Sequence, residues 1–128
     1  MPKDIYFPPR ELDVMASLWR RQSATVAEVR EDLGSRLAYT TVLSVLQTLT
    51  DKGYVRHEAE GRAYRYFPTV GPERAGQSAL SRIRDAVFQG SAARLFASFV
   101  ADEGLSRQEL ERMRRLLDER LAAKEPPR

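Results

Sequence analysis

The chain has 128 residues, 42% of them hydrophobic and 30% charged, a balance typical of a folded globular protein. It contains no cysteine, which excludes disulfides, thiolate metal ligands and thiol nucleophiles. Its longest apolar stretches are far too short to cross a membrane, and residues 1–9 lack the apolar core of a secretion signal, so we expect a cytoplasmic protein without membrane insertion. The net charge of +3 permits a polyanionic partner.

Two helices are predicted near the N-terminus. Leu12, Met15 and Leu18 follow Pro9 with the spacing of one helical face, and proline suits the first helical position because no amide donor is needed there. Residues Thr25–Glu28 have the form of a capping box, in which a threonine and a glutamate satisfy each other's backbone amides. We expect this box to open the second helix.

A third helix and a β-hairpin follow. The helical pattern of residues 39–52 stops at Gly53, a residue type that tolerates the left-handed conformation at a helix end. The pattern then alternates in residues 54–59 and 63–67, on either side of a short turn that contains Gly61. Three helices followed by a two-stranded hairpin is the order of a winged helix-turn-helix.

Only helical patterns follow Pro72, and the last two predicted helices open at Ser91 and at the capping box Ser106–Glu109. Both helices carry narrow apolar stripes on charged surfaces, formed by Leu95, Phe96, Phe99, Val100, Leu110, Met113, Leu117 and Leu121. Three short helices do not easily enclose a core, so we expect two copies of the chain to bury these stripes. The alternative is that the helices pack back onto the N-terminal domain of the same chain.

The predicted fold class is mainly α with a small β-hairpin. We expect a winged helix-turn-helix DNA-binding domain in residues 1–70 and a three-helix dimerisation region in residues 71–128.

The third helix carries the predicted DNA-reading surface. The expected core face is one arc formed by Val42, Val45, Leu46 and Leu49. The opposite face and its flanks carry short hydroxyl and amide side chains, namely Thr40, Thr41, Ser44, Gln47 and Thr48. Such groups bond to base edges and phosphates without filling a groove. We predict that this face binds DNA; the alternative is an ordinary solvent-facing surface.

The hairpin supplies positive charge. Arg62 directly follows the turn glycine, where a side chain can reach a phosphate or the minor groove. Arg65 alternates with Tyr64 and Tyr66, so it faces outward if both tyrosines pack inward. We predict that both arginines contact DNA; the alternative for each is a solvated strand residue.

The sequence does not favour an enzyme. His57 is the only histidine, and one imidazole makes neither a metal site nor a catalytic triad. No glycine-rich phosphate loop is present. We therefore expect no catalytic residues, no metal and no cofactor.

Three segments resemble the penicillinase-repressor family of BlaI, MecI and CopY type: Leu37–Leu49, Lys52–Val55 and Gly61–Tyr66. The segment Glu11–Trp19 is similar to the first helix of that family, and Phe88–Leu121 is similar to its dimerisation domain. The resemblance implies a homodimeric repressor bound to a palindromic operator, controlling genes for β-lactam resistance, cell-envelope stress or copper handling. The copper branch uses a cysteine-rich motif that this chain lacks.

In the β-lactam branch, a membrane sensor protease triggers cleavage of the repressor in its fifth helix. The matching bond here is Ser98–Phe99, where the best-known members carry asparagine in place of the serine. Two other hypotheses remain open on the residues alone. One is a winged-helix module that binds proteins rather than DNA, because residues 1–70 carry 10 basic and 9 acidic side chains. The other is a ligand-responsive winged-helix regulator of a different family.

Overall fold

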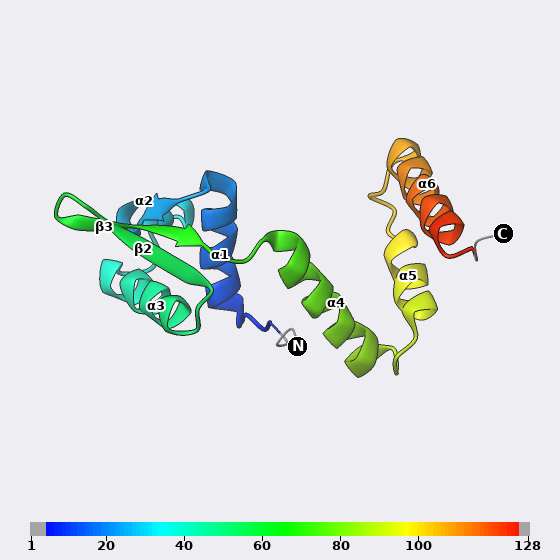
Figure 1. The fold of residues 1–128 in the computed structure, drawn as a ribbon, viewed down its shortest axis with the longest axis horizontal. Helices are drawn as coiled ribbons and strands as arrows, with labels where there is room; N and C mark the ends of the chain where they lie inside the picture. Colours follow the sequence, from blue (N-terminus) through cyan, green and yellow to red (C-terminus); the bar gives the residue numbers. More distant parts are fainter. Residues whose placement is uncertain (1–4, 126–128) are drawn as a thin grey trace. The chain divides into compact units, whose positions relative to one another are not determined.

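The computed structural model describes residues 5–125 and contains, within that range, six helices and one three-stranded antiparallel sheet (Figure 1). This confirms a mainly α fold with a small sheet. The elements in chain order are α1 (Pro9–Arg21), β1 (Ala24–Thr25), α2 (Val26–Asp32), α3 (Tyr39–Asp51), β2 (Val55–Glu60), β3 (Ala63–Pro68), α4 (Pro72–Val87), α5 (Ala92–Val100) and α6 (Arg107–Ala123).

The chain forms two compact units, Met1–Ser81 and Arg82–Arg128. The first holds the winged-helix elements and the first turns of α4, and the second holds the rest of α4 with α5 and α6. Along the sequence, the boundary between the units therefore falls within α4. The functional boundary that we predict after residue 70 stays a prediction.

Local sequence signals set the helix ends as expected. Pro9 occupies the start of α1. The capping box of α2 is complete, because the Glu28 amide donates to Thr25 Oγ1 at 3.2 Å and the Thr25 amide donates to Glu28 Oε1 at 2.9 Å. Gly53 follows α3 with a φ of +85°, the left-handed conformation that favours glycine. These three predictions are confirmed.

The sheet has one strand more than the sequence predicts. Its order is β1-β3-β2, and β1 pairs Ala24 with Tyr66 and Thr25 with Arg65. The two-stranded hairpin prediction is therefore incomplete. A strand of two residues shows no alternating pattern of its own, and only its pairing with β3 defines it.

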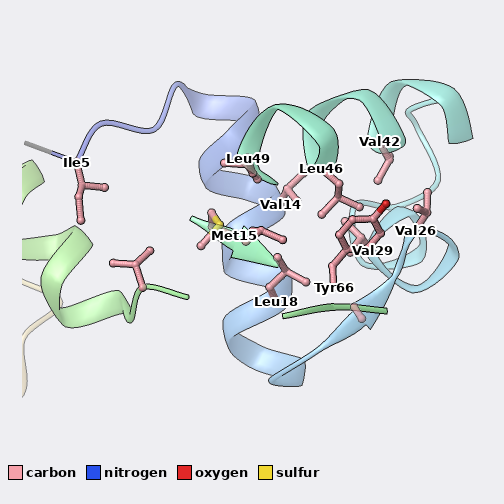
Figure 2. Close-up of a cluster of buried hydrophobic side chains, with 13 residues drawn as sticks. Ile5, Val14, Met15, Leu18, Val26, Val29, Val42, Leu46, Leu49 and Tyr66 are labelled. Carbon is pink, nitrogen blue, oxygen red and sulfur yellow. The ribbon is translucent and has the colours of Figure 1, made fainter. Parts of the chain in front are cut away.

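A single apolar core joins the three N-terminal helices to the sheet. Met15 and Leu18 of α1, Val29 of α2 and Leu46 of α3 are fully buried. Figure 2 shows these side chains gathered with Tyr66 of β3, which is only 3% exposed. Because α3 contributes a whole face to this core, its opposite face is held outward.

The second unit lacks such a core. Among residues 82–125, no side chain is buried. Large apolar side chains remain exposed on each of its helices, including Val87 (56%), Phe99 (54%) and Leu117 (44%). An exposed apolar surface of this kind is typical of an interaction surface.

A polar cluster joins α1 to α2 beside the core. Asp32 accepts hydrogen bonds from Arg21 Nε at 2.8 Å, Arg21 Nη2 at 2.9 Å and Ser17 Oγ at 2.6 Å. The Arg21 guanidinium, and then the Ser17 hydroxyl, lower the pKa of Asp32 to about 2. Ser17 is fully buried, so this carboxylate also satisfies a buried hydroxyl.

We expect this cluster to make the fold sensitive to acid. A carboxylate whose pKa is lower in the folded state stabilises the protein above its unfolded pKa, near 3.9, and this contribution is lost as the pH falls towards about 2. Asp32→Asn should lower the free energy of unfolding at pH 7 by about 1–2 kcal/mol, allowing for solvent screening, and should flatten its decline below pH 4. Urea denaturation across this pH range measures both effects. Asp13→Asn, at an exposed position of α1, is the control. An unchanged acid profile in Asp32→Asn would contradict the assignment.

Candidate nucleic-acid interface

The outward face of α3 carries the predicted reading residues. Thr40, Ser44, Gln47 and Thr48 are exposed and Thr41 is half-buried. Val42, Leu46 and Leu49 are fully buried on the other side of the helix, which fixes its rotation. The predicted division of α3 into a core face and a polar face is confirmed, whereas contact of these residues with DNA stays a prediction.

Hydrogen bonding within α3 distinguishes its polar side chains. Thr48 Oγ1 donates to the Ser44 carbonyl at 3.1 Å, so this hydroxyl hydrogen is already used. Ser44 and Gln47 make no side-chain hydrogen bond to any other residue in the range 5–125. Ser44 and Gln47 therefore keep all their donors and acceptors available for a partner.

The wing tip presents an arginine without an ion pair to the rest of the described chain. Gly61 adopts a φ of +62° in the turn, and Arg62 follows it, exposed at the end of the hairpin. Arg56, farther down the hairpin, is bonded to Glu58 at 2.8 Å. Of these two arginines, only Arg62 offers an uncompensated charge.

Of the two hairpin tyrosines, only Tyr66 packs into the core. Strand pairing sets Tyr66 opposite His57 and Tyr64 opposite Ala59, so both rings lie on one face of the sheet. Tyr66 is only 3% exposed, but Tyr64 is 50% exposed, because it lies two residues nearer the tip, where the core no longer covers that face. There its ring packs against His57 with centroids 4.5 Å apart.

A groove of about 480 Å³ lies between α3 and this face of the hairpin. Gln47 lines it from the helix, and Arg62 and Tyr64 line it from the wing. Tyr39 and His57, which the sequence does not single out as site residues, also line the groove. Tyr39 directly precedes Thr40 at the start of the reading helix, and this position in the sequence could have identified it as a site residue. Of the predicted DNA-contact residues, the groove brings together Gln47 and Arg62. The others do not line it, namely Thr40, Thr41, Ser44, Thr48 and Arg65.

Arg65 faces away from the tyrosine rings, as predicted, but is not free. Its Nε and Nη2 donate to Glu60 Oε1 and Oε2 at 2.9 and 3.1 Å, and its Nη1 donates to Glu28 Oε1 at 3.2 Å. The Glu60 carboxylate raises the pKa of Arg65. Its charge is therefore compensated within the protein, and contact of Arg65 with DNA stays a prediction.

The predicted dimerisation residues lie on α5 and α6. Leu95, Val100 and Met113 are half-buried, and the remainder are exposed, namely Phe96, Phe99, Leu110, Leu117 and Leu121. Leu116, which the sequence analysis omits, is also 59% exposed. The Ser98–Phe99 bond lies inside α5, near its C-terminal end.

The described residues contain no group of three or more histidine, cysteine, aspartate or glutamate side chains arranged to hold a metal ion. None of their helices is long and apolar enough to cross a membrane.

Known proteins resemble both halves of the chain. A family model described as penicillinase repressor matches residues 8–119. The transcriptional regulator BlaI of Mycobacterium tuberculosis is 47% identical over 64 residues, which are 48% of this chain and 46% of that protein, so the match spans about half of that relative. The penicillinase repressor of Bacillus licheniformis is 27% identical over 115 residues, 85% of this chain and 87% of that protein. The solution structure of the DNA-binding domain of the repressor BlaI is similar with a TM-score of 0.50 and 30% identity, over 58% of this chain and 93% of that chain.

Proposed function

Because the chain belongs to the penicillinase repressor family, whose model matches residues 8–119, we propose that it is a transcriptional repressor that binds operator DNA through α3 and the wing. The observation that carries this proposal is the outward face of α3, where Ser44 and Gln47 are exposed and keep their hydrogen-bonding groups available. Repression follows when the bound protein occludes promoter DNA. No catalytic step is part of this function.

The two parts of the interface have different roles. The major groove admits an α-helix, and a glutamine there can bond to adenine through two hydrogen bonds. We assign sequence reading to Ser44 and Gln47 and backbone contacts to Thr40, Thr41 and Thr48. Arg62 at the wing tip reaches an adjacent phosphate or the minor groove. The N-cap residue Ala38 supplies no side-chain acceptor to α3, which leaves its first amides available to a phosphate.

The repressor acts as a homodimer in this proposal. The support is the second unit, which buries no side chain among residues 82–125 yet exposes Phe96 and Phe99 on one stripe of α5. A second copy covers such a stripe and creates a two-fold axis. Two reading helices then enter successive major grooves about 34–36 Å apart, or a multiple of that, and the operator is palindromic.

We place the regulated genes in β-lactam resistance or cell-envelope stress. The support is the name of the Bacillus licheniformis relative, a penicillinase repressor that aligns with 85% of this chain.

The direct test is binding to the DNA upstream of the protein's own gene. Fluorescence anisotropy at about 150 mM salt should give an affinity at least about 1000-fold above that for shuffled DNA of equal length. Equal affinity for both would refute the repressor function. No affinity for either would leave the protein-interaction module as the better hypothesis.

We further propose that a membrane sensor protease ends repression by triggering cleavage of the Ser98–Phe99 bond. A helical bond must open locally before a protease can cut it. Cleavage separates Phe99 and all of α6 from the reading domain, so the product keeps its DNA-reading face but loses its partner. Mass spectrometry of the repressor from β-lactam-treated cells should detect a fragment ending at Ser98. Full-length protein throughout derepression would rule this mechanism out.

A further inference from the structure

The strongest remaining feature is a chain of alternating charges that runs from the wing tip to α1. Glu60, next to the turn, is bonded to Arg65, and Arg65 is bonded to Glu28 of α2. The other carboxylate oxygen of Glu28 lies 3.4 Å from Arg21 Nη1, and Arg21 is bonded to Asp32. Since Arg21 lies on α1, the series connects three separate parts of the first unit.

Arg65 does not bond to the residue directly opposite it. Its cross-strand neighbour is Glu58, but Glu58 is bonded to Arg56 on its own strand. Arg65 instead reaches diagonally to Glu60, two residues nearer the tip, with both carboxylate oxygens engaged. Long side chains can span such a diagonal, and the two-point geometry restricts the direction of both groups.

The anchor at the other end of Arg65 is already rigid. The same Glu28 oxygen that accepts from Arg65 also accepts the Thr25 amide at 2.9 Å, in the capping box of α2. Arg65 also pairs with Thr25 through the β1–β3 ladder. The Arg65 side chain is only 27% exposed, so solvent screens this contact less than a fully exposed pair.

We propose that Arg65 is a positioning residue for the wing: it ties Glu60 near the tip to the cap of α2 and thereby sets where Arg62 meets DNA. This inference rests on the proposed function, because it assigns Arg65 an indirect role in DNA binding. It differs from a direct phosphate contact, in which Arg65 itself would bond to DNA and its release from Glu60 would favour binding.

Substitutions that separate geometry from charge test the proposal. Arg65→Lys keeps the positive charge but cannot engage both oxygens of a carboxylate in the same plane. Glu60→Gln removes a negative charge near DNA, which by electrostatics alone should tighten binding. Glu58→Gln is the matched control, because it removes the same charge from the same strand and the Glu58 side chain is bonded to Arg56, not to Arg65.

The readout is the loss of operator affinity caused by Arg62→Ala in each background. In the wild-type and Glu58→Gln proteins we expect the same fold loss. In the Arg65→Lys and Glu60→Gln proteins we expect that loss to be about 2- to 5-fold smaller, because an untethered wing no longer holds Arg62 in place. The same loss in all four backgrounds would overturn the proposal. If Arg62→Ala caused no loss of operator affinity in the wild-type background, the positioning role of Arg65 would also be overturned. The repressor function would still stand in that case, provided that the wild-type protein binds the operator.

A second measurement does not need DNA. Hydrogen exchange of the amides of residues 59–64 should be faster in Arg65→Lys than in Glu58→Gln, since the tether protects the hairpin end. Equal exchange rates in the two variants would overturn the proposal. Faster exchange in Arg65→Lys would support the tether, and both outcomes hold whether or not the protein is a repressor.

Discussion

Phe99→Asp should turn the repressor into a monomer and weaken operator binding by about 100-fold or more. Phe99 is 54% exposed on the apolar stripe of α5, which we propose to be part of the dimer interface. An aspartate buried there without a partner costs several kcal/mol, more than a small interface can offset. Each half-site is then held alone, and the gain in affinity from two linked contacts is lost. Sedimentation equilibrium and operator binding measure the two effects on the same sample.

A control on the same helix separates interface loss from helix damage. Ser98→Asp adds the same side chain one residue away, outside the apolar stripe, and should leave both the dimer and operator affinity intact. Leu117→Asp tests α6, where the exposed fraction is 44%. Intact dimers in both Phe99→Asp and Leu117→Asp would refute the assignment of this surface.

Gln47→Ala should erode operator preference while leaving binding to unrelated DNA almost unchanged. Gln47 is exposed on α3 and keeps its amide free, and loss of a base contact costs about 1–3 kcal/mol, or about 5- to 150-fold in specific affinity. Arg62→Ala should act in the opposite manner. It should weaken binding to every DNA sequence. It should also reduce the slope of log affinity against log salt concentration by about one unit, the amount expected for one lost phosphate contact.

Salt titrations of both variants on operator and shuffled DNA distinguish these outcomes. Gln77→Ala is a matched glutamine control, because Gln77 is exposed on α4 and does not line the groove. If Gln47→Ala lowered affinity for both DNAs equally, Gln47 would be a backbone contact. If Arg62→Ala changed neither affinity nor salt slope, the wing would not touch DNA.

Features that depend on neighbouring residues could be predicted from the amino-acid sequence. Helical periodicity identified the buried face of α3, with Leu46 inside and Gln47 outside. Local capping chemistry located the start of α2 at Thr25 and the end of α3 at Gly53. These features follow from contacts within about one helical turn, so they are visible in a short window of sequence.

The tertiary structure alone decided the features that join distant residues. β1 exists only through its pairing with β3, and Tyr64 is exposed because the core stops short of the wing tip. Arg65 follows the outward alternation predicted for it, yet Glu28, 37 residues earlier, supplies a carboxylate that compensates its charge. Sequence spacing cannot show which of several outward charges meet, because that depends on how helix and sheet pack around the core.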